Sequence, residues 1–504
     1  MKTTTIITKL GILSLLCAAV LFAQVTPQVQ MFRNEPKGNI QYRKKGTLDG
    51  NLVRTIYQNS GEISDWFDGA VRAPHGEWPK GTGHRSLDGL GLLIGSRVKI
   101  TDATGKVKYI TPIQSAYREE MDVDPVTRDI WGLEPVPGYA NPASTKPGIN
   151  VDKSSFPGQW PRSIFYDLYG TAEDSIKKWD GFWYGYFGRG VSNAQLETYF
   201  VIDDASDKEF ANALDRFYPV AGDSARGGLG LRVETRGFQW THVLAEDIIF
   251  WHYDIVNISD NDYDSTVFGF YTDPSVGSVN NDAKFDRQLD MAYAWAPTGK
   301  GLPDNYKTGY YGQSFLESPG NGLNGVDDDG DALKTDGTLW KNGTAFNPDM
   351  IDERRDDGID NDQDWQRYTD ANNNGKWDAD EPLNDDLGKD GVGVFDPQYQ
   401  GPDEGEGDGL PTLGEPSFDR TDKDESDQIG LQSAYINILG NKGPTGVWPK
   451  NDNIMWGVMT NGFVDTSVTN SNISMVFSSG IFPLKKNQRE RFSIAVLFGD
   501  DLSD

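Results

Sequence analysis

The densest group of oxygen-bearing side chains in the sequence lies between Asp370 and Glu381, which reads DANNNGKWDADE. Calcium takes six to eight oxygen ligands, and an EF-hand loop of twelve residues supplies them from positions 1, 3, 5, 7, 9 and 12, with glycine at position 6. Gly375 occupies the sixth position. The ligand positions hold Asp370, Asn372, Asn374, the main-chain carbonyl of Lys376, Asp378 and Glu381. Because every position is filled, the spacing predicts a calcium loop rather than a solvated turn.

Two features distinguish this loop from a paired EF-hand. Trp377 stands where an aliphatic residue would contact a partner loop, and Pro382 follows the last ligand. The segment before Asp370 also lacks the apolar spacing of an amphipathic helix. The sequence therefore favours a stand-alone, EF-hand-like loop.

Two further stretches, Gly325–Asp331 (GVDDDGD) and Gly358–Asp364 (GIDNDQD), share one pattern, and the second follows 33 residues after the first. Alternating acidic residues with small neighbours can wrap one cation within a few residues. The predicted ligands here are Asp327, Asp329, Asp331, Asp360, Asp362 and Asp364. A charged, flexible linker remains the alternative. The acidic clusters at 385–390 and 403–408 could supply more ligands, although neither has a recognisable register.

Negative charge is concentrated around these motifs. The chain of 504 residues carries a formal net charge of -29, and residues 321–424 hold 29 acidic side chains against 9 basic ones, a net of -20. Such a balance argues against nucleic acid and anionic membranes as partners and favours cations, with calcium as the expected cofactor. Because apolar residues are sparse in this segment, it should not fold alone without bound metal.

The first residues are typical of an export signal. Lys2 and Lys9 precede a short apolar run, Leu10–Ala23, and Ala23 is a plausible cleavage point, so residues 1–23 are expected to be a signal peptide. No later stretch is apolar and long enough to predict a transmembrane segment in the mature chain. The only cysteine, Cys17, lies inside this run, so bound metal could replace disulfides in a protein that is secreted or held on the outer cell surface.

The rest of the chain predicts a mainly β fold, a β-sandwich with long loops and an Asp/Asn/Gly-rich calcium-binding insert. After the signal peptide we expect an N-terminal β-rich region over 24–230. The two parts of the sandwich should span 231–318 and 425–504, on either side of the acidic insert, 319–424. Two separate β domains joined by a calcium linker are the alternative. Strands are expected at 247–258, 265–272, 291–296, 432–439, 454–459, 472–477, 482–484 and 491–498, with hairpins joining the first pair and the last pair.

Motifs for catalysis are mostly missing. The four histidines lack zinc-binding spacing, and no G-x-S-x-G elbow or P-loop occurs, so an enzyme is not the favoured interpretation. A glycosidase needs only two carboxylates without a fixed motif, and exposed aromatic residues can stack on sugars. A carbohydrate-active protein, either a glycan-binding module or a glycoside hydrolase, is therefore the alternative function.

Parts of the chain resemble known secreted proteins. Residues 185–200 (GYFGRGVSNAQLETYF), 226–240 (RGGLGLRVETRGFQW), 477–482 and 491–499 are similar to large bacterial surface proteins of the type IX secretion class. The acidic stretch resembles the calcium repeats of thrombospondin type 3 and dockerin modules. This resemblance implies an exported calcium-binding structural or adhesive protein, with surface glycans or other surface proteins as partners. Such proteins usually continue into a sorting domain, so the resemblance also implies a chain truncated at its C-terminus.

Overall fold

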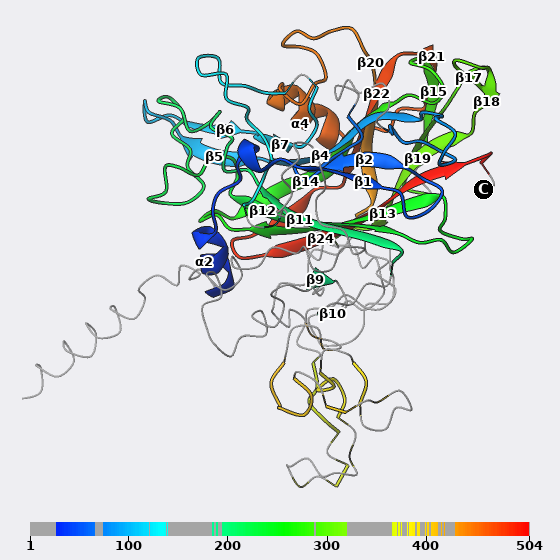
Figure 1. Cartoon of the computed structure of the whole chain (residues 1–504). Helices are drawn as coiled ribbons and strands as arrows, with labels where there is room; N and C mark the ends of the chain where they lie inside the picture. The colour runs from blue at the N-terminus through cyan, green and yellow to red at the C-terminus, as the bar shows by residue number, and fades with distance from the viewer. Residues whose placement is uncertain are drawn as a thin grey trace, which may run out of the picture.

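The structure is a computed structural model. It describes residues 27–65, 74–119, 121–137, 139, 194–286, 289–319 and 429–502, two short strands within 184–189, and scattered residues between 365 and 418. Over these residues the chain is mainly β, as the sequence predicts, and its long strands form two antiparallel sheets (Figure 1). The expected signal peptide, 1–23, lies outside the described residues.

The first sheet combines strands from the beginning, middle and end of the chain. Its order is β1 (Lys45–Leu48), β2 (Thr55–Gln58), β3 (Glu62–Ile63), β4 (Leu87–Ser96), β14 (Tyr263–Pro274), β22 (Ile473–Ser479) and β20 (Leu431–Ile438), with β7 (Ile113–Ser115) paired to β4 and β23 (Phe482–Leu484) paired to β14.

The second sheet is assembled in the same way. Its order is β21 (Ser467–Ser471), β15 (Asn281–Asp286), β16 (Met291–Trp295), β19 (Tyr310–Glu317), β24 (Arg489–Gly499), β13 (Ile248–Asn257), β12 (Leu231–Gln239), β11 (Leu196–Asp203) and β8 (Glu134–Pro135).

Smaller elements decorate the two sheets. Three two-stranded ribbons are formed by β5 (Val98–Thr101) with β6 (Val107–Ile110), β9 (Tyr184–Gly185) with β10 (Gly188–Arg189), and β17 (Lys300–Gly301) with β18 (Tyr306–Lys307). The helices of the described residues are α2 (Pro27–Asn34), a 3-10 turn at Ile40–Tyr42, and α4 (Asp452–Thr460). Among the residues that the structure places, no helix has the length and apolar character needed to cross a membrane.

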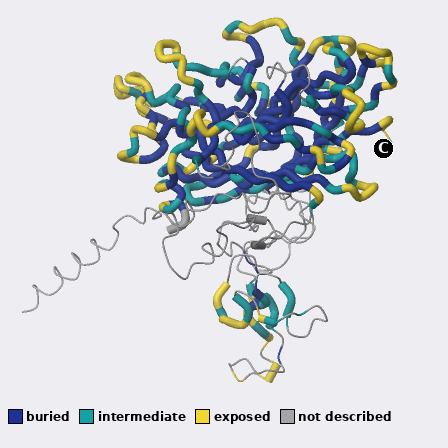
Figure 2. Tube along the Cα trace, viewed as in Figure 1, coloured by how far each residue is buried: buried dark blue, intermediate teal, exposed yellow. Residues whose placement is uncertain are grey.

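The main core lies between the facing sides of the two sheets, where Figure 2 shows the longest run of buried chain. Alternate residues of the central strands point into it, as the period of two in a β-strand requires. Phe268 of β14 stacks on Phe492 of β24 with ring centroids 4.0 Å apart. Tyr57 of β2, in the first sheet, meets Trp251 of β13, in the second, edge to face with ring centroids 5.9 Å apart. These contacts hold one sheet against the other as a sandwich.

A second apolar layer covers the outer face of the first sheet. Val267 and Tyr271 of β14 point away from the main core and pack in a cluster that includes Met455 and Met459 of α4. Because both faces of β14 are covered, nearly every residue of this strand is buried, without the alternation of a half-exposed strand.

Both hairpins predicted from the sequence are wrong. β13 pairs with β12 and β24, whereas β14 pairs with β4 and β22 in the other sheet. In the same way β23 pairs with β14, and β24 with β13 and β19. In a sandwich a short polar turn can carry the chain from one sheet to the other, and its residues look like those of a hairpin turn.

The predicted strand at 454–459 is also wrong, because these residues belong to helix α4. Met455 and Met459 are four residues apart and are both buried, which is the spacing of one helical face. The apolar run is short, and a short apolar run does not distinguish a strand from a buried helix.

The predicted segments of the sandwich share the two sheets. β19, which precedes the acidic insert, pairs with β24, which follows it. The boundary predicted at residue 230 does not separate sheets, since β11 pairs along its length with β12. The ends of the insert also meet: the Ile429 amide donates a hydrogen bond to the Pro319 carbonyl (3.1 Å), and the Gly430 amide donates to Ser318 Oγ (3.0 Å). We call these four residues the neck.

Candidate metal sites

Three of the ligands predicted in the first calcium loop are described: Asn372, Asn374 and Glu381. The carboxylate of Glu381, at position 12, accepts hydrogen bonds at Oε1 from the amides of Ala371 (2.8 Å) and Asn372 (3.3 Å). Asn372 Oδ1 accepts one from the Asn374 amide (3.0 Å). Glu381 is buried, with 3% of its surface exposed. The last ligand position is therefore folded back onto the start of the loop, as a shared cation site requires.

Hydrogen bonds also connect the residues just before the loop with those just after it. The Gln366 amide donates to Asp385 Oδ2 (2.7 Å), and the Asp385 amide donates to the Gln366 carbonyl (2.8 Å). Thr369 Oγ1 donates to Asn384 Oδ1 (2.8 Å). These bonds join the segments that enter and leave the loop, so its closure does not depend on Glu381 alone.

The remaining predicted ligands lie outside the described residues: Asp370, Lys376, Asp378, Asp327, Asp329, Asp331, Asp360, Asp362 and Asp364.

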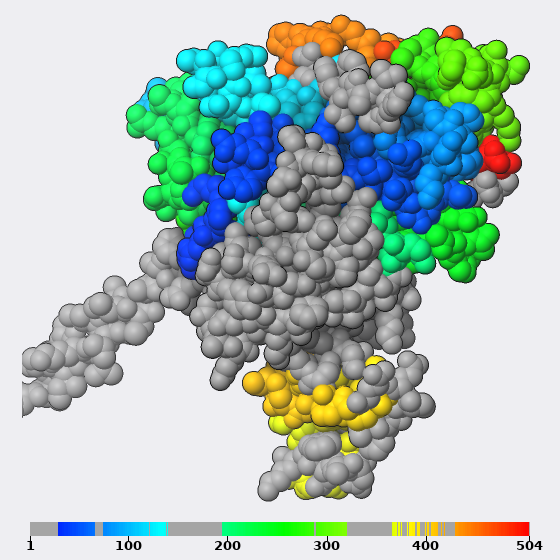
Figure 3. All heavy atoms as spheres, viewed as in Figure 1, coloured from blue at the N-terminus to red at the C-terminus, as the bar shows by residue number. Residues whose placement is uncertain are grey.

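Two acidic residues of the insert that were not assigned as ligands are fully buried. Asp386 Oδ2 accepts a hydrogen bond from the Gly409 amide (3.0 Å), and its Oδ1 is buried without a hydrogen-bond partner. Glu415 Oε1 accepts one from the Gly388 amide (3.2 Å). Burial of a carboxylate is costly unless hydrogen bonds or a cation compensate it, and at Asp386 part of this compensation comes from Arg367, whose Nε lies 3.5 Å from Oδ2. The described residues of the insert lie apart from the two sheets (Figures 1 and 3).

A second acidic group, which we call the carboxylate cluster, lies in the body of the protein. It consists of Asp122, Glu209 and Asp452, and one ligand oxygen from each lies within 4.8 Å of the others. Asp452 opens helix α4, where its Oδ2 accepts a hydrogen bond from the Ile113 amide of β7 (3.0 Å). The other two residues come from the loop after β7 and the turn after β11. The cluster therefore joins α4 to both sheets.

Burial and mutual repulsion raise the pKa of all three carboxyl groups. The pKa of Asp122 rises to about 6 through burial and the nearby charge of Asp207. The pKa of Glu209 rises to about 8 through burial and the charges of Asp207 and Asp122. The pKa of Asp452 lies well above its ordinary value through burial and the charges of Glu209 and Asp207. Lys450 opposes the shift at Asp122 only in part.

Asp207 lies next to the carboxylate cluster and accepts a hydrogen bond from the main chain of one of its members. It is buried, and its two oxygens accept hydrogen bonds from Gln114 Nε2 (2.6 Å) and from the Glu209 amide (3.0 Å). Close carboxylates can be stabilised either by protons or by a hard cation with oxygen ligands. The sequence gives no sign of this group, because its members come from three distant segments and share no spacing.

Comparison with known proteins adds no family. No protein-family model matches the chain, and the search of curated proteins found no match.

Proposed function

We propose that the chain is an exported calcium-binding protein with a structural or adhesive role at the outer cell surface, of the kind carried by type IX secretion. In this proposal calcium neutralises the carboxylates of residues 321–424 and orders that insert on a β-sandwich. The loop between 370 and 381 would be a calcium site of the thrombospondin type 3 or dockerin kind.

One observation carries the proposal. Glu381, in the twelfth position of the predicted loop, is buried against the amides of Ala371 and Asn372. An acidic side chain in a solvated linker would gain more by facing water. Its return to the start of the loop agrees with the ligand order that was deduced from the spacing alone.

Calorimetric titration of residues 24–504 with calcium would test the proposal, together with thermal unfolding in calcium and in chelator. Extracellular calcium modules bind at about 10⁻⁴–10⁻³ M. One such site should therefore add roughly 1.4–2.7 kcal/mol to the free energy of unfolding at a calcium concentration of about 10 mM.

The decisive variant is the double substitution Asp370→Asn and Glu381→Gln. It should remove one calcium equivalent and reduce the calcium-dependent rise in melting temperature. Asp304→Asn, an exposed acid between β17 and β18, is the matched control and should leave both quantities unchanged. Unchanged stoichiometry and affinity in the double variant would rule out this loop as a site.

A further inference from the structure

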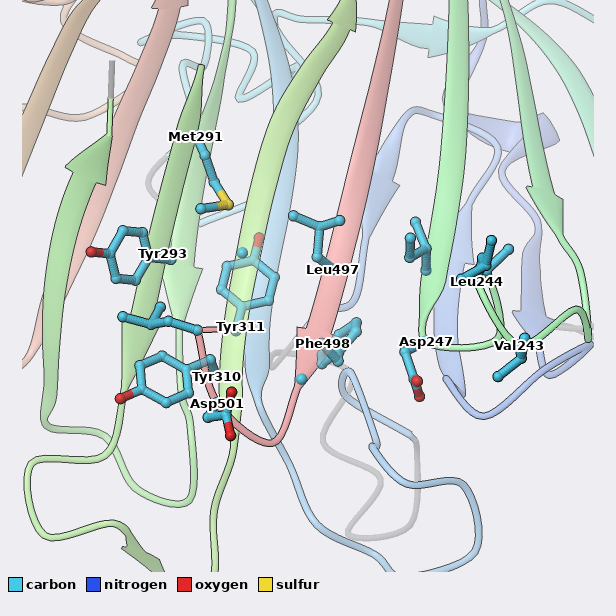
Figure 4. Close-up of a pocket in the computed structure, with 15 residues that line it drawn as sticks. Val243, Leu244, Asp247, Met291, Tyr293, Tyr310, Tyr311, Leu497, Phe498 and Asp501 are labelled. Carbon is cyan, nitrogen blue, oxygen red and sulfur yellow. The ribbon is translucent and has the colours of Figure 1, made fainter. Parts of the chain in front are cut away.

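The outer face of the second sheet contains a hollow of about 520 Å³ (Figure 4). The pairing register explains where it lies. Tyr293 of β16, Gly312 of β19, Leu497 of β24 and Ile248 of β13 form one row across four neighbouring strands. Gly312 has no side chain, and Leu497 Cδ1 and Met291 Sδ lie 3.3 Å and 3.6 Å from where its Cβ would stand, so these two side chains narrow the gap over the glycine and form part of the floor.

The walls of the hollow are mainly apolar. Met291 and Tyr310 flank the gap on the side of β16 and β19. On the opposite side, Val243 and Leu244 line it from the turn before β13 and are 72% and 80% exposed. Leu502 lines it near the end of β24 and is 63% exposed. Apolar side chains so exposed around one hollow are typical of an interaction site.

The charges at the hollow have one sign. Asp247 and Asp501 line it, and none of the described residues that line it is basic. Asp247 Oδ1 accepts a hydrogen bond from Trp78 Nε1 (2.6 Å), which fixes this carboxylate at the edge. The chain as a whole also carries a net charge of -29. An occupant should therefore combine bulky apolar groups with positive charge.

We propose that this hollow binds an extended segment of a partner protein in which bulky apolar side chains stand beside lysine or arginine. An apolar side chain would pack against Met291 and Leu497, and the basic residues would face Asp247 and Asp501. The exposed side chains of Val243, Leu244 and Leu502 extend the apolar surface beyond the hollow, which suits a peptide better than a compact small molecule.

The hollow contains none of the predicted calcium ligands, so this proposal is independent of the calcium sites. The test uses the full chain and a labelled ten-residue peptide of alternating leucine and lysine with blocked ends, followed by fluorescence anisotropy in calcium and in chelator. We expect saturable binding in both conditions that weakens as salt is added. The same peptide with glutamate in place of lysine should bind at least tenfold more weakly.

Surface variants locate the site without disturbing the core. Leu244→Ser and Asp501→Asn should each weaken binding of the leucine–lysine peptide by about fivefold or more, in the range of a lost interface contact. Val279→Ser, which changes another exposed apolar residue (56% exposed) outside the hollow, should have no effect. Equal binding of both peptides, or equal binding by all three variants, would overturn the proposal. The proposal would also be overturned if neither peptide bound and an oligosaccharide bound instead, in a way that Leu244→Ser abolished.

Discussion

At the scale of single residues, the buried carboxylates distinguish this protein. Glu381, Asp386 and Glu415 are buried within the acidic insert, and Asp452 is buried in the body. The spacing of the twelve-residue loop made Glu381 a predicted calcium ligand, and that role stays a prediction. The sequence could not predict the carboxylate cluster, since nothing in the local pattern links Asp452 to residues more than two hundred positions earlier.

The carboxylate cluster predicts how stability depends on pH. In chelator, the folded state holds its protons to a higher pH than the unfolded state, because the pKa values of Asp122 and Glu209 are raised to about 6 and about 8. The unfolded chain releases the same protons near pH 4–4.5. The free energy of unfolding should therefore fall as pH rises from about 4.5 to 8. The melting temperature, measured across this range in chelator, should fall with it.

Two comparisons assign part of this slope to the cluster. Glu209→Gln should reduce the slope, and the raised pKa values of Asp204, Glu62 and Asp273 account for a part that remains. Glu246→Gln, at a glutamate outside the cluster, should leave the slope unchanged. If a cation replaces the protons, calcium should raise the melting temperature more at pH 8 than at pH 5.5. An unchanged slope in Glu209→Gln would show that other groups cause the pH dependence.

At the scale of elements, the sequence located most of the later strands but not their partners. The predicted strand at 247–258 corresponds to β13 (Ile248–Asn257), and the one at 491–498 to β24 (Arg489–Gly499). β-branched and aromatic residues mark a strand locally. Which sheet a strand joins depends instead on packing between residues far apart in sequence, such as Phe268 and Phe492. The sequences of the turns do not indicate this packing.

Close packing of β4 gives a prediction for this strand. A Cβ added to Gly91 would lie 2.4 Å from the Tyr117 amide nitrogen, which belongs to the main chain and cannot swing aside. Gly91→Ala should therefore lower the free energy of unfolding by about 1–3 kcal/mol, as overpacking does in a close-packed core. Chemical denaturation would measure the change.

Gly457→Ala in helix α4 is the opposite case and serves as the control. Nothing lies within 4 Å of a Cβ added there. Alanine should stabilise the helix by about 0.5–1 kcal/mol relative to glycine. If Gly91→Ala were as stable as the wild type, the main chain at Tyr117 would have to be free to move away from β4.

At the scale of the whole molecule, the sandwich is continuous across the acidic insert. Strands before and after the insert pair directly, as β14 does with β22 and β19 with β24. In the neck, hydrogen bonds from the amides of Ile429 and Gly430 join the two ends of the insert. The insert therefore leaves and re-enters the sandwich at two adjacent points.

Replacement of residues 320–428 by a four-residue glycine–serine turn tests this arrangement. The shortened chain should fold with the same near-ultraviolet circular dichroism from its buried aromatic residues. Closing a shorter loop costs less entropy, so the free energy of unfolding should rise by up to roughly 3 kcal/mol. Loss of cooperative unfolding would mean that the sandwich depends on the insert for its stability. Calcium binding that persists in the shortened chain would have to come from outside the insert.

The closed neck also determines how a mechanical load would pass through the protein. A pull on the insert enters the sandwich at Pro319 and Ile429, side by side. One path leads into β19 of the second sheet and the other into β20 of the first. Tension would thus be divided between both sheets: β19 lies inside the second sheet, between β16 and β24, whereas β20 is the edge strand of the first. The pairing of β20 with β22 is therefore the weaker of the two attachments under such a load.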